Sequence, residues 1–489
     1  MDTIQEPTRG VPVIAEYDVV ICGGGPAGCS AAIASARNGA KTLLVEKDGY
    51  LGGATVSQLV LVILSTNGVD FQGIWHEHMS RLRSLNAVRF EKHWNHPDFV
   101  TKHSGFRGSV DPERVKFVWD DLVSEAGTEQ LLHCYAANPI IEENSGRKTI
   151  QGVFVETIAS RQAILAKRIV DATADGIVCA QAGVPWEQGD GTNPWAMSCT
   201  KVYRIGGVEW PDTWPTEDGV EKLRADIVAA VDRGEYDAPV VTEVNRLVNY
   251  VRGKNWRLPE QRPEMMSVLS RVLRVDTLDP FDITRAEREG REQARQGADV
   301  FGRFVPGQEK SYLLDTSARL GVRSSRRIKG IATVTNKDAV RLCKHPDGIA
   351  RGSFGIDVWP ADSYRKQAGD EGGSNAFSLI GVTREERAAQ IADGEYYDIR
   401  YGTLVAQGVD GLMMAGRCIS ADHFAESSLR IQQTCMATGE AAGLAAALSI
   451  QHDKTPRELD AGIVIEKLNQ SRAATRPAFE ELDGIASFM

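Results

Sequence analysis

The sequence has no long apolar run and no basic tract. Its longest apolar run is Leu59–Leu64, whereas a helix needs about 20 such residues to cross a bilayer. The 489 residues carry a net charge of −10, with no lysine and arginine cluster suited to nucleic acid or an anionic membrane. The polar N-terminal stretch has no signal-peptide core. We therefore expect a cytoplasmic protein that binds neither nucleic acid nor membranes.

Paired cysteines and metal-binding motifs are also missing. The eight cysteines are scattered without any C-x-x-C spacing, which excludes the usual zinc, iron–sulfur and redox-disulfide patterns. H-E-x-x-H is absent, and His76 and His78 are too close in sequence to share a helix face. We predict no metal site, and we expect the cysteines to be core thiols in a reducing compartment.

The sequence does contain a complete dinucleotide-binding unit between Tyr17 and Lys47. It runs from a strand through a glycine turn and a small-residue helix to a second strand that ends at Glu46. The helix N-terminus would face the phosphates, and the Glu46 carboxylate would accept from a ribose 2′-OH and repel a 2′-phosphate. NADP is therefore disfavoured, while FAD and NAD both remain open. The turn residues are Gly23, Gly25, Pro26, Ala27 and Gly28.

Further patterns predict how the rest of the chain is organised. Asp111 is a good N-cap for a helix over Pro112–Ala126. Two β-rich runs, Gln151–Ile158 and Ala163–Val170, predict a hairpin. The second run ends at small residues, as a strand does against a bulky cofactor.

We predict an α/β protein with a discontinuous Rossmann-like domain and an inserted α+β substrate or cap domain. The cofactor-binding domain would comprise residues 1–190, with a helical insertion at about 57–110, and a return segment at 397–450. The cap domain would span 191–396, and a helical tail 451–489. Thr434 is the expected cap of the small-residue helix in the return segment.

Five motifs in this order resemble the FAD-dependent oxidoreductases of the two-dinucleotide-binding-domain, glutathione-reductase-like flavoprotein superfamily. They are GGGPAG at 23–28, LGGAT at 51–55, IVDATADG at 169–176, GLMMAGRCIS at 411–420 and TCMATGEAAG at 434–443. The resemblance implies an extended FAD, with Glu46 on the adenosine ribose. It also implies that Gly416 and the helix at Thr434 reach the flavin. The full set of implied cofactor-binding residues is Gly23, Gly25, Pro26, Ala27, Gly28, Glu46, Lys47, Gly52, Gly53, Ala54, Thr55, Ala172, Thr173, Gly416, Arg417, Thr434 and Cys435.

The chain departs from this family pattern in three places. Many relatives read A-T-G-D-G where this chain has Ala174 at the third position. Others read I-P-Y-R where residues 399–402 are IRYG, or carry a histidine in place of Trp359. These differences predict a substrate unlike theirs. No histidine lies beside Gly52–Gly53, so we expect noncovalent FAD.

His423 and Arg326 are the predicted catalytic residues. His423 lies between the Gly416 motif and the Thr434 helix, and a histidine can act as a base near neutral pH. A surface or hydrogen-bonding histidine is the alternative. Arg326, with Arg323 and Arg327, would bind a carboxylate or an anionic transition state, unless these arginines merely pair with surface acids.

Three classes of function remain open. The first is a dehydrogenase or oxidase that takes a hydride from an alcohol, sugar, hydroxy acid or amine and passes electrons to oxygen, a quinone or a carrier. The second is a flavin monooxygenase or reductase that NAD(P)H reduces, and the third is a non-catalytic binding module that contains FAD. The partners would be a small-molecule substrate and that electron acceptor, and a homo-oligomer is compatible with the sequence.

Overall fold

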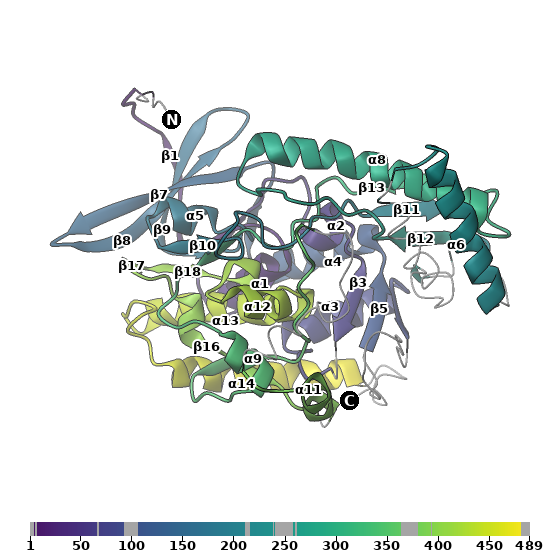
Figure 1. Cartoon of the computed structure of the whole chain (residues 1–489). Helices are drawn as coiled ribbons and strands as arrows, with labels where there is room; N and C mark the ends of the chain where they lie inside the picture. The colour runs from purple at the N-terminus through teal and green to yellow at the C-terminus, as the bar shows by residue number, and fades with distance from the viewer. Residues whose placement is uncertain are drawn as a thin grey trace.

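A computed structural model of the chain contains a central α/β unit and a smaller unit of sheet and helices (Figure 1). It describes residues 4, 7–65, 68–91, 106–210, 216–237, 239, 258–259, 262–362, 380–392 and 394–480. Among these residues, no helix is both long and apolar enough to span a bilayer.

The central sheet has eight strands, and its main path has the order β17-β8-β9-β1-β2-β6. β1 pairs in parallel with β2 and β9, as a Rossmann-like fold requires. β8 and β9 pair antiparallel, which confirms the predicted hairpin. The strands are β1 (Val13–Cys22), β2 (Thr42–Val45), β6 (Glu129–Leu131), β7 (Tyr135–Asn144), β8 (Arg147–Glu156), β9 (Arg161–Asp171), β17 (Val409–Asp410) and β18 (Leu412–Met414).

Two helices from opposite ends of the chain pack on this sheet at close range. They are α1 (Pro26–Arg37) and α13 (Gln432–Gln451). A Cβ on Gly439 or Gly443 of α13 would overlap the backbone of α1, so glycine is what lets the two helices approach. The predicted cap of α13 is wrong: Ile431 holds the N-cap position, and Thr434 is already the third helical residue.

The stretch after the second strand contains more sheet than the helical insertion we expected. Its strands β3, β5 and β4 form a three-stranded antiparallel sheet beside α3 and α4. Asp111 caps α4 by accepting from the backbone N–H groups of Glu113 and Arg114, as predicted. The elements are α2 (Ala54–Ser57), β3 (Val62–Ser65), α3 (Ile74–Ser84), β4 (Val88–Glu91), β5 (Phe106–Val110) and α4 (Pro112–Glu125).

The smaller unit has a separate core around a three-stranded antiparallel sheet, β12-β11-β13, with α6 and α8 beside it (Figure 1). Tyr203 and Phe301 are fully enclosed in this core. The elements are β11 (Tyr203–Gly206), α6 (Glu217–Asp232), β12 (Glu264–Ser267), α8 (Pro280–Phe304) and β13 (Tyr312–Thr316). The domain boundaries at 190, 396 and 450 stay predictions.

Shorter elements join the two units and close the chain. β10 pairs antiparallel with β14, and β15 with β16. α14 packs against α3 and ends at residue 480, so the last nine positions of the predicted tail lie outside the described residues. These elements are α5 (Ile177–Gln181), β10 (Trp186–Gln188), β14 (Arg326–Ile328), α9 (Asn336–Arg341), β15 (Gly348–Gly352), α11 (Arg384–Ala392), β16 (Tyr397–Arg400), η2 (Tyr401–Leu404), η3 (Gly416–Cys418), α12 (His423–Leu429) and α14 (Ala461–Glu480).

Candidate functional site

The glycine turn between β1 and α1 leaves open space beside the start of the helix. A Cβ on Gly28 would overlap the carbonyl oxygen of Gly23, so packing within the protein requires that glycine. Among the described residues, a Cβ on Gly25 would meet nothing nearer than Gly53 Cα at 3.7 Å, and no side chain caps α1. This space and the uncapped N-terminus of α1 together suit an anionic phosphate group.

Glu46 lies beside this turn, as the sequence predicted. It directly follows β2, is buried, and accepts from the backbone N–H groups of Gly24 at 2.5 Å and Asp48 at 2.8 Å. Burial raises the pKa of the Glu46 carboxyl, although the two N–H donors act in the opposite direction. The carboxylate therefore fixes the shape of the glycine turn, and its role at a ribose stays a prediction. The neighbouring Lys47 ammonium is 6.0 Å from the ring centroid of Tyr135.

The second glycine loop crosses directly over the first. Gly52 and Gly53 have φ values of 110° and 49°, and a Cβ on Gly53 would be 2.6 Å from Gly25 Cα. Ala54 then begins α2, and the Thr55 hydroxyl is 2.6 Å from Gln432 Oε1 at the start of α13. The fold thus links the loop after β2 to a helix almost four hundred residues later.

The other predicted cofactor residues lie around the same turn. Gly416 has a φ of 78°, and a Cβ there would be 2.8 Å from Ala27 Cβ and 3.8 Å from Cys435 Sγ. A Cβ on Gly23 would be 2.5 Å from the carbonyl oxygen of Ala172. The Thr173 hydroxyl already donates a hydrogen bond within the protein, to the Asp171 carboxylate at 2.6 Å.

Thr434 contributes a polar group near the N-terminus of α13. Its hydroxyl is buried and has no hydrogen-bond partner among the described residues. Within the described ranges, no side chain caps this helix either. The structure thus brings two uncapped helix starts, α1 and α13, to one region, joined through the contacts of Gly416 with Ala27 and Cys435.

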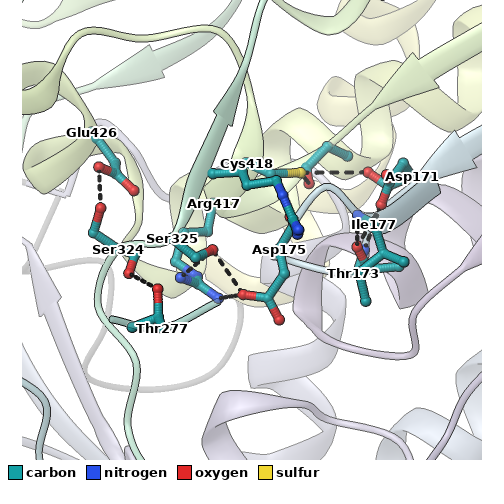
Figure 2. Close-up of polar contacts among 12 residues, drawn as sticks. Asp171, Thr173, Asp175, Ile177, Thr277, Ser324, Ser325, Arg417, Cys418 and Glu426 are labelled. Atoms are coloured by element: carbon teal, nitrogen blue, oxygen red, sulfur yellow. Dashed lines mark hydrogen bonds and ion pairs between the residues drawn. The ribbon is translucent and has the colours of Figure 1, made fainter. Parts of the chain in front are cut away.

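A partly buried ion pair directly follows Gly416, with the Arg417 and Asp175 side chains 11% and 32% exposed. Arg417 contacts Asp175 at 2.6 Å, and the Ser325 hydroxyl donates to the same carboxylate at 2.7 Å (Figure 2). Burial alone would raise the pKa of Asp175, but the Arg417 charge and the Ser325 hydrogen bond lower it below its usual value. Asp175 therefore stays ionised and orients Arg417.

A second ion pair lies on the other side of the serine pair. The Ser324 hydroxyl donates to Glu426 Oε2 at 2.7 Å, and Arg327 contacts that oxygen at 3.2 Å (Figure 2 shows the serine contact). The Arg327 and Glu426 side chains are only 4% and 1% exposed, so this pair is shielded from water. Burial raises the pKa of Glu426, and Arg327 partly counteracts that effect.

His423 is the first residue of α12, and Glu426 follows one turn later. Burial, with the charge of Arg327 as a smaller cause, lowers the pKa of His423 to about 4. The imidazole is therefore neutral at pH 7. Its Nδ1 is buried and lacks a hydrogen-bond partner within the described ranges. This histidine can accept a proton.

Arg326 points to different partners from its neighbour Arg327. It donates to the carbonyl oxygen of Asp175 at 3.1 Å, and its guanidinium is 5.1 Å from the ring centroid of Trp186. Adjacent residues of a strand face opposite sides, which separates the two arginines. The catalytic role of Arg326 stays a prediction, whereas Arg327 acts on His423.

Sequence reasoning assigned no role to the two acids and two serines of these networks. Glu426 lies three residues after His423, a spacing that puts both on one face if the segment is a helix. The paired serines before the arginines gave no comparable signal, because their carboxylate partners are more than 90 residues away.

Comparison with known proteins places these observations among flavoproteins. The family model described as FAD dependent oxidoreductase matches residues 18–471. A dihydrolipoyl dehydrogenase of Trypanosoma brucei brucei is 51% identical over 49 residues, which are 10% of this chain and 10% of that protein. A pseudooxynicotine dehydrogenase of a Pseudomonas species is 30% identical over 129 residues, or 25% of this chain and 22% of that protein.

Solved structures similar over most of the chain are distant in sequence. The flavin-dependent brominase Bmp2, as a triple mutant, has a TM-score of 0.44 at 12% identity, covering 94% of this chain and 86% of that one. A geranylgeranyl bacteriochlorophyll reductase-like protein from Thermoplasma acidophilum has a TM-score of 0.35 at 11% identity, covering 97% and 100%.

Proposed function

This chain belongs to the FAD-dependent oxidoreductase family, and from that premise we propose that it is a dehydrogenase or oxidase. Its substrate would be a small organic molecule with an oxidisable C–H bond beside an O–H or N–H group. Noncovalent FAD supplies the acceptor for the hydride. Electrons would then pass to oxygen, a quinone or a carrier.

The residues present fit FAD. Gly25 leaves room beside an uncapped helix for a pyrophosphate, and Gly53 brings a second loop to the same place. Glu46 would hold the adenosine ribose, and the start of α13 would face the flavin with its uncapped N–H groups. The buried, unpartnered Thr434 hydroxyl at that helix start, within the described residues, is a further group that a cofactor would satisfy.

The observation that carries the proposal is His423, a neutral imidazole with a buried nitrogen that lacks a partner among the described residues. When the substrate C–H bond breaks, its electron pair leaves with the hydrogen as hydride. The O–H or N–H proton passes to His423, and the carbon–heteroatom double bond forms. Burial keeps the histidine neutral beforehand, and the positive charge of Arg327 adds to this effect because it disfavours a second positive charge nearby.

Anaerobic titration of the FAD-loaded protein tests this proposal. Alcohols, sugars, hydroxy acids and amines are added singly while the visible flavin absorbance is followed. We expect one class to bleach the flavin without nicotinamide, and we expect His423→Ala to slow that bleaching by about 10²- to 10⁴-fold with FAD still bound. Bleaching by NADH or NADPH alone would contradict the proposal and favour a monooxygenase or reductase.

A further inference from the structure

Three buried polar atoms without partners in the described part of the chain lie on the proposed base and on two charged residues near it. They are His423 Nδ1, Glu426 Oε1 and Arg327 Nε, and none has a hydrogen-bond partner among the described residues. Arg327 contacts the other oxygen of Glu426 at 3.2 Å, and His423 and Glu426 are one helical turn apart. We call these three residues the α12 polar cluster.

Such a concentration of unsatisfied atoms points to a ligand. Native proteins pair nearly all their buried polar groups, because each unpaired one costs about 1–3 kcal/mol. Among the residues that the structure describes, the Glu426 carboxylate is held in place on one side only, by Ser324 and Arg327 at Oε2. Its Oε1 is therefore fixed in position with its hydrogen-bonding capacity unused.

The kinds of atom in the cluster select the chemistry of that ligand. Glu426 Oε1 accepts, Arg327 Nε–H donates, and the neutral His423 accepts at Nδ1 when its proton is on Nε2. A hydroxyl group donates and accepts at once, so two neighbouring hydroxyls can satisfy all three atoms. A carboxylate supplies only acceptors and would face the Glu426 charge, and an ammonium supplies only donors and would face Arg327.

We propose that the α12 polar cluster binds adjacent hydroxyl groups of a neutral polyol or sugar. Arg327 and Glu426 carry opposite charges, so the pair favours a substrate without net charge. The inference rests on the proposed function, and it narrows the substrate class from any alcohol, hydroxy acid or amine. Glu426 and Arg327 would bind one hydroxyl, while His423 takes the proton of the one that is oxidised.

The first test compares substrates that share a carbon skeleton but differ in charge. The FAD-loaded protein is titrated anaerobically with sorbitol and glucose, and with gluconate and glucosamine as anionic and cationic counterparts. We expect at least one neutral compound to bleach the flavin, and the charged counterparts to do so about 10-fold less efficiently or not at all. Bleaching by gluconate or glucosamine in preference to every neutral compound would overturn the inference and leave the dehydrogenase proposal intact.

The second test replaces the acceptor Oε1 with a donor without changing the shape of the side chain. The amide oxygen of a glutamine would stay with the donors Ser324 and Arg327, which puts its NH2 group at the Oε1 position. Glu426→Gln should raise the apparent Kd for the neutral compound by about 10- to 100-fold, because a hydrogen bond to a charged group is lost. The readout is the shift of the flavin spectrum on binding, which needs no turnover. Glu440→Gln is the matched control, because Glu440 is also a buried glutamate paired with an arginine, Arg472 at 3.1 Å, but lies on α13 outside the α12 polar cluster. Its Kd should change by less than about 3-fold. An unchanged Kd in Glu426→Gln would overturn the inference.

A double variant keeps the test valid if the single one unfolds. Arg327→Gln with Glu426→Gln leaves no unpaired buried charge, which is the costly outcome of removing one partner. It should bind FAD and lose the spectral response to the polyol, and a retained response would overturn the inference. If NADH alone reduces the flavin, the proposed function fails, but a polyol-induced spectral shift that Glu426→Gln abolishes would still support the binding site.

Discussion

At the scale of single residues, Ala174 stands out because its backbone is left-handed, with a φ of 66°. A residue with a Cβ pays roughly 1–2 kcal/mol for this conformation, which glycine adopts freely. At this position the chain departs from the glycine of the motif that its sequence resembles. The strain is held in place by the neighbouring bonds from Thr173 to Asp171 and from Ser325 to Asp175.

We therefore expect Ala174→Gly to stabilise the protein. Relief of the strain should raise the free energy of unfolding by about 1 kcal/mol. The extra conformational entropy that glycine gives to the unfolded chain should offset part of this gain. Urea denaturation of the FAD-free protein measures this. The matched control is Ala180→Gly in the right-handed helix α5 of the same segment, which should lower the free energy of unfolding by about 0.5–1 kcal/mol. Equal losses from both substitutions would contradict the assigned strain.

His423 should also set the acid limit of activity. Its folded-state pKa is about 4, so it stays neutral and can accept a proton down to that pH, whereas an ordinary histidine would be half protonated near 6.5. We expect kcat/KM for flavin reduction to be flat between pH 7 and 5 and to fall as the pH drops through about 4. A fall centred near 6.5 would show that His423 is not the desolvated base. The residual rate of His423→Ala should lack the acid limb.

At the scale of elements, two glycines in the turn between β1 and α1 are needed for different physical reasons. Gly28 is needed for packing against Gly23, while Gly25 has space around it in the protein alone. The distinction matters because both kinds of glycine look identical in the G-x-G-x-x-G pattern.

Gly25→Ala and Gly28→Ala should accordingly fail in different ways. The free energy of unfolding of Gly25→Ala should lie within about 1 kcal/mol of the wild-type value, because the φ of −78° at this position suits alanine. The variant should nevertheless lose most of its FAD affinity. Gly28→Ala should lose at least about 3 kcal/mol of stability, because its Cβ would overlap the backbone. Denaturation and FAD titration of both variants provide the check. Full FAD affinity in a folded Gly25→Ala would refute the proposed phosphate position.

At the scale of the whole molecule, distant segments converge on one region. Thr55 contacts Gln432, Asp175 contacts Arg417, and Arg327 contacts Glu426. Each contact joins an earlier part of the chain to the segment 397–450. The site is therefore complete only when that segment has packed against the rest of the protein. FAD binding should therefore report on global folding.

The reactivity of the cysteines offers an independent measure of how tightly the core is packed. All eight are free thiols, and seven of them are buried, leaving Cys343 partly accessible. Burial raises the pKa of Cys343 as well, so its reaction should be slow. Alkylation of the native protein followed by intact-mass measurement should label about one thiol, and labelling in denaturant should reach all eight. Rapid labelling of several native thiols would contradict the enclosed core.

The local elements were predictable where a short pattern is decisive. Asp111 before proline marked the start of α4, and the β-rich runs marked the β8–β9 hairpin. The cap of α13 was predicted wrongly because Thr434 has a capping residue's chemistry, yet helix geometry continues upstream through Gln432 and Gln433. The strand β3 was missed because its only signal was the apolar run Leu59–Leu64, which suits helix or strand equally. The short strands β4 and β5 were missed because their sequences, VRFE and FRGSV, contain no apolar run.

The sequence by itself determined the cofactor unit, because glycine spacing, a strand and a terminal acid are local features with few alternative uses. It also placed His423 between two cofactor motifs. Only the tertiary structure decided what surrounds that histidine. The pKa of His423, the choice of Arg327 over Arg326 as its neighbour, and the buried Glu426 all depend on desolvation and on contacts across about 100 residues of chain. Such contacts follow from how segments pack, and no short pattern encodes them.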